Sequence, residues 1–276
     1  MPELPRVKLG RLEVSRLLIG GNPFSGISHQ HPGLDQELLD YYTTENIKKA
    51  LARAQQSGIN AFVARADRHF LRVLRECHQE GRISMHWVAQ TVPELADFRN
   101  GLAAALSCPY RPAAIYFHGG LADSLWQEKK LLQLQEFLQM IKDTGVLCGL
   151  AAHLPETIEE AESQDWPVDF YLTCFYNPAG RGKKGLTVLT GSAGEYFDEK
   201  DPFRMAQAIQ AVKKPCLAYK VLAAGRKSVT PGLLKEAFRF AYASIKPGDA
   251  VVVGVFQKYR DQIAEDVSLV REILSS

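Results

Sequence analysis

The sequence has few cysteines, and their arrangement builds no recognisable site. There are five, an odd number, widely spaced and without a CxxC pair. Neither a disulfide framework nor a zinc knuckle is therefore predicted. Cys148, Cys174 and Cys216 stand in apolar runs and are interpreted as core residues.

The chain also lacks long apolar runs and a large excess of charge. It contains no run of about 18 apolar residues, so no membrane span is expected. The opening segment MPELPRVKLGRLEVSR has no apolar core of the signal-peptide kind. The formal net charge of +2 is too small to indicate nucleic acid or an anionic membrane as a partner. We expect a cytoplasmic protein whose partner is a small-molecule substrate; the sequence leaves the oligomeric state open.

No Gly/Ser linker, charge block or internal repeat divides the 276 residues. Instead, nearly continuous apolar runs, typical of strands buried on both faces, alternate with stretches of helical period. Strands are predicted at 16–21, 61–64, 86–90, 113–119, 148–153, 169–177, 216–221 and 250–256. Eight strands alternating with helices at this length predict a single α/β domain over 1–276, a (β/α)8 or TIM barrel.

Two helical stretches carry clear end signals. In 129–145 the apolar residues recur on one face, and Gly145 follows as a stop. In 230–248 Thr230 is a predicted N-cap, with Pro231 at the first helical position.

Polar side chains end almost every predicted strand. The carboxyl ends of barrel strands build the active site in barrel enzymes, so we expect these side chains to share one mouth. The alternative is that each one only hydrogen-bonds loop backbone. The set comprises Asn22, Arg65, Asp67, Arg68, His69, Gln90, His118, His153, Tyr176, Asn177, Lys220 and Gln257.

His118 and Lys220 are the most informative members. His118 precedes two glycines, which would let a ligand approach an imidazole that acts as donor or general acid. A hydrogen-bonded core histidine is the alternative. Lys220, at the end of a buried strand, suits a Schiff base, a proton transfer or an electrostatic role. Barrels often bind phosphate with their last two loops, and here those loops carry Gly225, Arg226, Lys227, Gly254, Lys258 and Arg260.

A metal site is considered and not favoured. His29 and His31 form an HxH pair like that of metal-dependent hydrolases, but roughly ten residues beyond the strand, where ligands would be poorly held. Asp67, His69 and His118, with His153, are the other residues that could converge on a metal ion.

Several segments, in order, resemble the aldo-keto reductase superfamily over nearly the whole length. They are LEVSRLLIGGNPFSG, GIN followed by Phe62, GLAAHLPETIEEA, DFYLTCFYNP, YKVLAAG and AVVVGVFQKYRDQIAEDV. The resemblance implies a barrel that binds NAD(P) and reduces a carbonyl group. It also implies a catalytic aspartate, tyrosine, lysine and histidine.

Most of that tetrad is replaced. The aspartate position holds Val63, the tyrosine position Arg68 and the lysine position Gln90, whereas the histidine is matched by His118. A guanidinium is a poor proton donor and a good anion clamp. We therefore expect Arg68 to orient an anionic group and His118 or His69 to supply the proton. Asp67 and Lys220 complete the predicted catalytic set.

The remaining predictions concern binding. Phe256 and Gln257 stand where the family usually places a base for the 2′-phosphate, so the resemblance leaves NAD and NADP open. Glu265 and Asp266 resemble the pair that contacts adenine. Substrate-binding residues are predicted as Asn22, Arg65, Gln90 and His153, and NAD(P)-binding residues as Tyr176, Asn177, Gly225, Arg226, Gly254, Lys258 and Glu265.

The predicted function is an NAD(P)-linked oxidoreductase of aldo-keto reductase type with a non-standard active site. Its predicted substrate is small and polar, and the sequence leaves open whether it carries an anionic group. Two alternatives stay open. One is a non-redox barrel enzyme, an isomerase, lyase or hydrolase, with or without a metal. The other is a ligand-binding protein that has lost catalysis.

Overall fold

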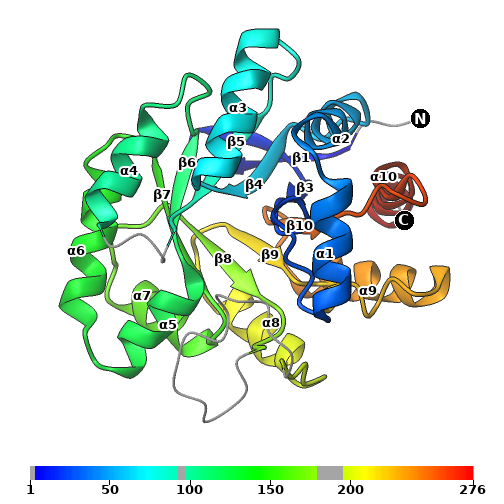
Figure 1. Cartoon of the computed structure of the whole chain (residues 1–276). Coiled ribbons are helices and arrows are strands. Elements are labelled where there is room, and N and C mark those ends of the chain that lie inside the picture. Colours follow the sequence, from blue (N-terminus) through cyan, green and yellow to red (C-terminus); the bar gives the residue numbers. More distant parts are fainter. Residues whose placement is uncertain (1–3, 93–96, 179–194, 276) are drawn as a thin grey trace.

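Eight parallel strands form a closed barrel at the centre of the molecule (Figure 1). The computed structural model describes residues 4–92, 97–178 and 195–275. Around the barrel the strands follow the order β10-β3-β4-β5-β6-β7-β8-β9, so each pairs with the next strand along the chain. The (β/α)8 barrel predicted from the sequence is confirmed. The strands are β3 Leu17–Gly20, β4 Ala61–Arg65, β5 His86–Gln90, β6 Ala114–Phe117, β7 Leu147–Ala152, β8 Phe170–Cys174, β9 Cys216–Tyr219 and β10 Ala250–Gly254.

Side chains along each strand alternate between the barrel interior and the surrounding helices. On β4, Ala61 and Val63 belong to the interior cluster, whereas Phe62 and Ala64 belong to the outer one. A residue two positions after the last interior residue therefore points into the barrel mouth. Besides Gly20 and Gly254, this period places six strand-end residues there: Arg65, Gln90, His118, His153, Cys174 and Tyr219.

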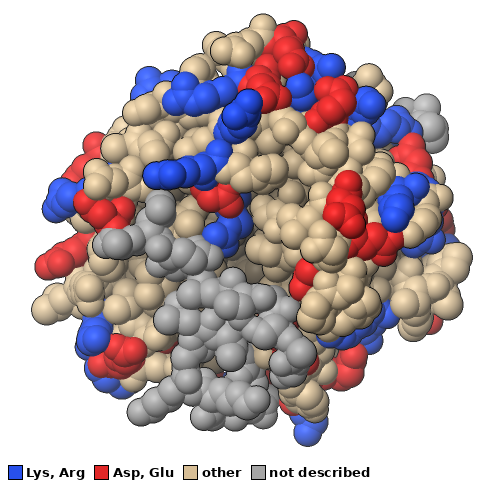
Figure 2. All heavy atoms as spheres, viewed as in Figure 1, with Lys and Arg blue, Asp and Glu red and all other residues tan. Residues whose placement is uncertain are grey.

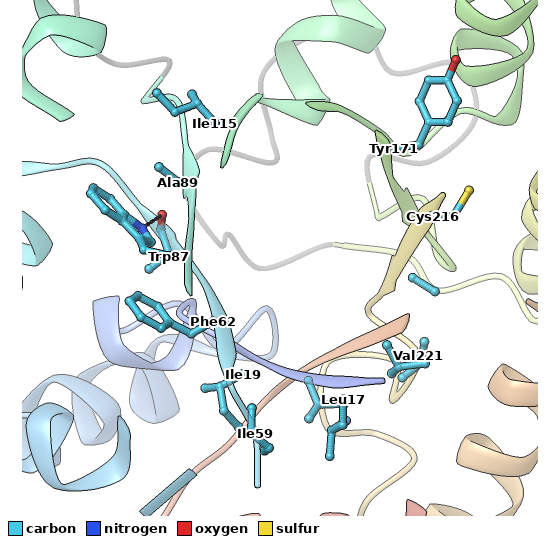
Figure 3. Close-up of a cluster of buried hydrophobic side chains, with 14 of the residues drawn as sticks. Leu17, Ile19, Ile59, Phe62, Trp87, Ala89, Ile115, Tyr171, Cys216 and Val221 are labelled. Carbon is cyan, nitrogen blue, oxygen red and sulfur yellow. Dashed lines mark hydrogen bonds between the residues drawn. The ribbon is translucent and has the colours of Figure 1, made fainter. Parts of the chain in front are cut away.

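The outward side chains pack beneath the helices (Figure 3). Leu17, Phe62, Trp87 and Ile115 are almost completely buried in this layer. Burial of each such side chain contributes roughly 1.5–3 kcal/mol. The indole N–H of Trp87 donates to the carbonyl of Ala64 at 3.1 Å, so its polar atom is satisfied inside the core (Figure 3).

Helices cover the outside of the barrel (Figure 1). Their predicted ends are confirmed at the two helices with clear end signals: Thr230 accepts a hydrogen bond from the Leu233 N–H, Pro231 begins α9, and Gly145 follows α6 with a φ of 76°. The helices are η1 Pro23–Ser25, α1 Pro32–Tyr41, α2 Thr44–Gln56, α3 Arg68–Glu80, α4 Phe98–Leu106, α5 Gly119–Gln127, α6 Leu131–Lys142, α7 Pro155–Ser163, α8 Asp201–Ala211, α9 Pro231–Ser244 and α10 Gln262–Ser275.

A short hairpin that the sequence analysis did not predict closes the other end of the barrel. Its antiparallel strands are β1 Arg6–Leu9 and β2 Leu12–Ser15. Leu9 and Val14 join the interior cluster, next to Leu147 at the start of β7. The carboxyl ends of the strands are thus left to form a site. In the part of the chain that is described, no helix has the length and apolar character to span a membrane; the cytoplasmic location stays a prediction.

Candidate functional site

A cavity of about 280 Å³ opens at the carboxyl ends of the strands. It is lined by the ends of β3, β4, β5, β6, β8, β9 and β10 and by the connections after β3, β9 and β10, and it extends to the first turn of α10. Figure 2 shows basic and acidic side chains interspersed over the face seen in Figure 1, without a large patch of one sign. Five predicted site residues line the cavity: Asn22, Gln90, Lys220, Gly225 and Gly254.

Tyr219 faces this cavity and begins a buried relay. Its hydroxyl lies 3.2 Å from Nε2 of His153, whose Nδ1 lies 3.0 Å from Oδ2 of Asp123. Asp123 is itself fixed, because it also accepts the backbone N–H of His153 and the hydroxyl of Thr157. A carboxylate at Nδ1 requires the ring proton there, so Nε2 of the neutral ring accepts from the Tyr219 hydroxyl.

The environment keeps Tyr219 protonated. Burial, and then the neighbouring Cys174 thiol, raise the pKa of Tyr219 well above its ordinary value. The relay also explains Gly119, since a Cβ at that position would lie 3.2 Å from both Cε1 of His153 and the Tyr219 hydroxyl. Tyr219 is thus a neutral phenol at neutral pH, with a hydroxyl proton to donate in a hydrogen bond.

His118 is buried beside this relay and caps α5. Its Nδ1 accepts the N–H of Leu121 at 3.3 Å. Burial lowers the pKa of His118 to about 3, with further contributions from His153, Arg65 and Lys220. The ring is therefore neutral at neutral pH and carries its proton on Nε2, which suits hydrogen-bond donation rather than donation of a proton from an imidazolium.

Lys220 lies against His29, beside the Tyr219 ring, whose centroid is 5.8 Å from the Lys220 Nζ. The Lys220 Nζ is 3.1 Å from Nε2 of His29, and the Asn22 amide nitrogen is 3.2 Å from the same atom. Nδ1 of His29 lies 2.9 and 3.0 Å from the two carboxylate oxygens of Glu195. The side chains of His29 and Glu195 are each only 5% exposed, so the cluster is largely shielded from water.

The pKa values of the cluster follow from this burial. Burial, followed by the charge of Lys220, lowers the pKa of His29 to about 4. Burial alone would raise the pKa of Glu195, but the hydrogen bond and charge of His29, with the charges of Lys220 and Arg226, hold it below its ordinary value. At neutral pH a neutral His29 thus donates from Nδ1 to a Glu195 carboxylate.

At the far end of the cavity Asp266, on α10, is almost completely buried. Burial, and then the charge of Glu265, raise the pKa of Asp266 to about 8, against the opposing effect of Arg260. Arg260 also lines the cavity, and its guanidinium lies 3.4 Å from Glu265 and donates to the Ser228 carbonyl. This end therefore presents a neutral carboxyl group and one partly paired cation.

The barrel has the same architecture as aldo-keto reductases of known structure. An aldo-keto reductase of Bacillus halodurans in its holo form aligns with a TM-score of 0.62 over 98% of this chain and 91% of that protein, at 12% sequence identity. A Klebsiella pneumoniae aldo/keto reductase in complex with NADP and acetate aligns with a TM-score of 0.53 over 96% and 90%, at 13% identity. The chain has the aldo-keto reductase fold. No protein-family model and no curated protein sequence matches it.

Within this aldo-keto reductase fold, the residues at the family's tyrosine position do not line the cavity. Arg68 and His69 are exposed in the first turn of α3. Asp67 is the N-cap of that helix, where it accepts the N–H of Phe70 and the Nε–H of Arg65. At the lysine position Gln90 does face the cavity and accepts the hydroxyl of Tyr116 at 2.8 Å.

The predicted cofactor residues are only partly brought together. Outside the cavity lining, Tyr176 is buried against Phe197, and the Asn177 N–H donates to Asp201. Arg226 donates to the backbone carbonyls of Ala223 and His29, and Lys258 pairs with Glu37. The basic side chains expected to hold a phosphate are thus mostly occupied.

The sequence analysis did not identify four residues of the site. Asp123, Glu195 and Tyr219 were not named, and His29 was considered only as a metal ligand. Tyr219 was detectable, because it follows the interior residue Leu217 by two positions. Asp123 and Glu195 lie on other elements and carry no local signal. Among the residues that the structure describes, no cluster of three potential metal ligands occurs.

Proposed function

We propose that this chain is an NAD(P)-linked reductase of small polar carbonyl compounds, in which Tyr219 is the proton donor. One observation carries the proposal: the cavity connects the Tyr219 relay at the barrel axis with the start of α10. A dinucleotide needs such an extended path. The fold analogy with nicotinamide-dependent enzymes supports the same reading, as analogy only.

The lining suits the cofactor in shape and in charge. Its two cationic side chains are Lys220 near the barrel axis and Arg260 near α10. Gly225 and Gly254 provide side-chain-free backbone along the path between them. Near α10 the basic side chains form ion pairs: Lys258 with Glu37, and Arg260 with Glu265. We therefore expect no strong preference for the 2′-phosphate of NADP.

A bound nicotinamide would supply hydride, and the residues of this chain would supply position and proton. Asn22 and Gln90 offer amide groups to a polar substrate, and Lys220 offers a positive charge to an anionic one. As negative charge grows on the carbonyl oxygen, the Tyr219 hydroxyl donates its proton. The phenolate left behind takes up a proton from water, and its hydroxyl then donates again to Nε2 of His153, which Asp123 holds in place.

The test is turnover of NADH or NADPH with a panel of aldehydes and 2-oxo acids. Tyr219→Phe should lower kcat by roughly 10² to 10⁴ and leave cofactor affinity unchanged. Tyr110→Phe is the matched control, since the Tyr110 hydroxyl bonds only the backbone of Met85 in a different layer. Full activity of Tyr219→Phe, or no turnover with any carbonyl compound, would count against the proposal.

A further inference from the structure

The contacts of Lys220 point to a second kind of chemistry, beyond hydride transfer. Within the described part of the chain its ammonium group has no carboxylate partner, and its hydrogen bond goes to His29. A lysine beside a cavity normally pairs with an acid or extends into water. Here Lys220 is half-buried in the wall of the mouth cavity and bonds a histidine.

The geometry restricts the protons that the pair can hold. Lys220 Nζ and His29 Nε2 are 3.1 Å apart. An ammonium group has no lone pair, so it can face Nε2 only if that nitrogen is unprotonated. If Nε2 carries the proton instead, Lys220 must be a free amine. One proton therefore lies between the two nitrogens, and its transfer to His29 leaves a nucleophile.

Glu195 lessens the free-energy cost of that transfer. Its two oxygens lie 2.9 and 3.0 Å from Nδ1 of His29, so an imidazolium formed at His29 is stabilised by a buried carboxylate. The other titratable groups beside the pair are His153, His118, Arg226, Cys174 and Tyr219. Arg226 reaches the backbone carbonyl of His29 and fixes the loop, rather than bonding the ring.

The backbone on both sides is held in an uncommon conformation. Lys220, Ala223 and Ala224 have φ values of 57°, 48° and 53°, and His29 has 57°, all in the left-handed region. Non-glycine residues there cost energy and concentrate at functional sites. The two loops are also joined by a hydrogen bond from the Gln30 amide to the Ala224 carbonyl. The Lys220 and His29 side chains are thus set against each other by strained, cross-linked loops.

We propose that Lys220 forms a reversible imine with a small aldehyde or ketone bound in the mouth cavity. The proton of the Lys220 ammonium passes to Nε2 of His29. The amine lone pair then attacks the carbonyl carbon, a C–N bond forms, and one proton moves from the attacking nitrogen to the carbonyl oxygen. His29 returns its proton to this oxygen, the C–O bond breaks and water leaves, which gives the protonated imine and one water molecule without any oxidant or reductant.

The experiment is reductive trapping on the wild-type protein without a nicotinamide cofactor. The folded protein is incubated at pH 7 with butanal or pyruvate and sodium cyanoborohydride, and each lysine is quantified by peptide mass spectrometry. Lys227 and Lys258, paired with Glu199 and Glu37, serve as internal references. Lys220 should be modified roughly tenfold faster than either reference, or more. Equal or slower modification of Lys220 overturns the proposal.

Glu195→Gln separates a proton-transfer role from a structural one. The amide cannot stabilise an imidazolium, so modification of Lys220 at pH 7 should fall roughly tenfold and recover at higher pH. An unchanged rate and pH profile would remove His29 and Glu195 from the proposal. The assay contains no cofactor, so its result is independent of the proposed reductase activity. Lys220 can remain unmodified in a protein that reduces carbonyl compounds, and it can form the imine in a protein that does not.

Discussion

The buried carboxyl group of Asp266 makes the stability of this protein depend on pH. Burial raises the pKa of Asp266 from 3.8 to about 8. Between these values the folded chain retains a proton that the unfolded chain has lost, so the free energy of unfolding falls as the pH rises. The contribution of Asp266 is fully present below about pH 4 and is lost as the pH passes 8.

The magnitude follows from the two pKa values. A difference of about four units, from 3.8 to about 8, corresponds to roughly 5 kcal/mol. Roughly 3 to 4 kcal/mol of this is lost between pH 5 and pH 8. Asp266→Asn cannot ionise, so its stability should exceed that of the wild type by roughly 1–2 kcal/mol at pH 5 and by roughly 5 kcal/mol at pH 8.

The assay is urea unfolding followed by circular dichroism at pH 5, 6, 7 and 8. Only the difference between Asp266→Asn and the wild type is interpreted, because other groups titrate equally in both. Asp165→Asn is the control, since the side chain of Asp165 is 92% exposed and its replacement should leave the pH profile unchanged. A difference between Asp266→Asn and the wild type that is the same at pH 5 and pH 8 would refute the reasoning.

Two further predictions concern glycines in β7 and α9, and the residues Arg68 and His69, which lie outside the cavity lining. Gly149→Ala should destabilise the protein by about 1–3 kcal/mol or more, because its Cβ would lie 2.5 Å from Cζ of Phe170 and 2.8 Å from Cβ of Tyr116. Gly232→Ala, in α9 with no atom within 4 Å, should instead stabilise it by roughly 0.5–1 kcal/mol in the same urea assay. Arg68→Ala and His69→Ala, both exposed, should change stability by no more than about 0.5 kcal/mol and leave NADH affinity unchanged; a clear loss of affinity would place these residues in the site.

The barrel could be predicted because its strands are buried on both faces. Continuous apolar runs such as 250–256 are typical of strands buried on both faces. The hairpin of β1 and β2 lacks such a run, since it caps the barrel with only Leu9 and Val14 reaching the interior. Two-residue periodicity also locates the inward strand ends, including His118 and His153.

The site was predicted less well because local patterns do not reveal partners. Asp67 precedes an amphipathic helix, and its N-cap role is the commoner use of an aspartate at that place. The HQH motif was weighed only as a metal site, which was not favoured, whereas the structure pairs His29 with Glu195, 166 residues away. Such pairings arise only when the barrel brings distant loops to one mouth.

The central claim is that a nicotinamide dinucleotide lies along the cavity from Tyr219 to α10. Calorimetric titration of the wild-type protein with NADH and NADPH tests it most directly. The account predicts saturable one-to-one binding of both, weakened roughly tenfold or less by Arg260→Ala, which removes one charged contact. Absence of binding by either nucleotide in the folded protein would contradict it.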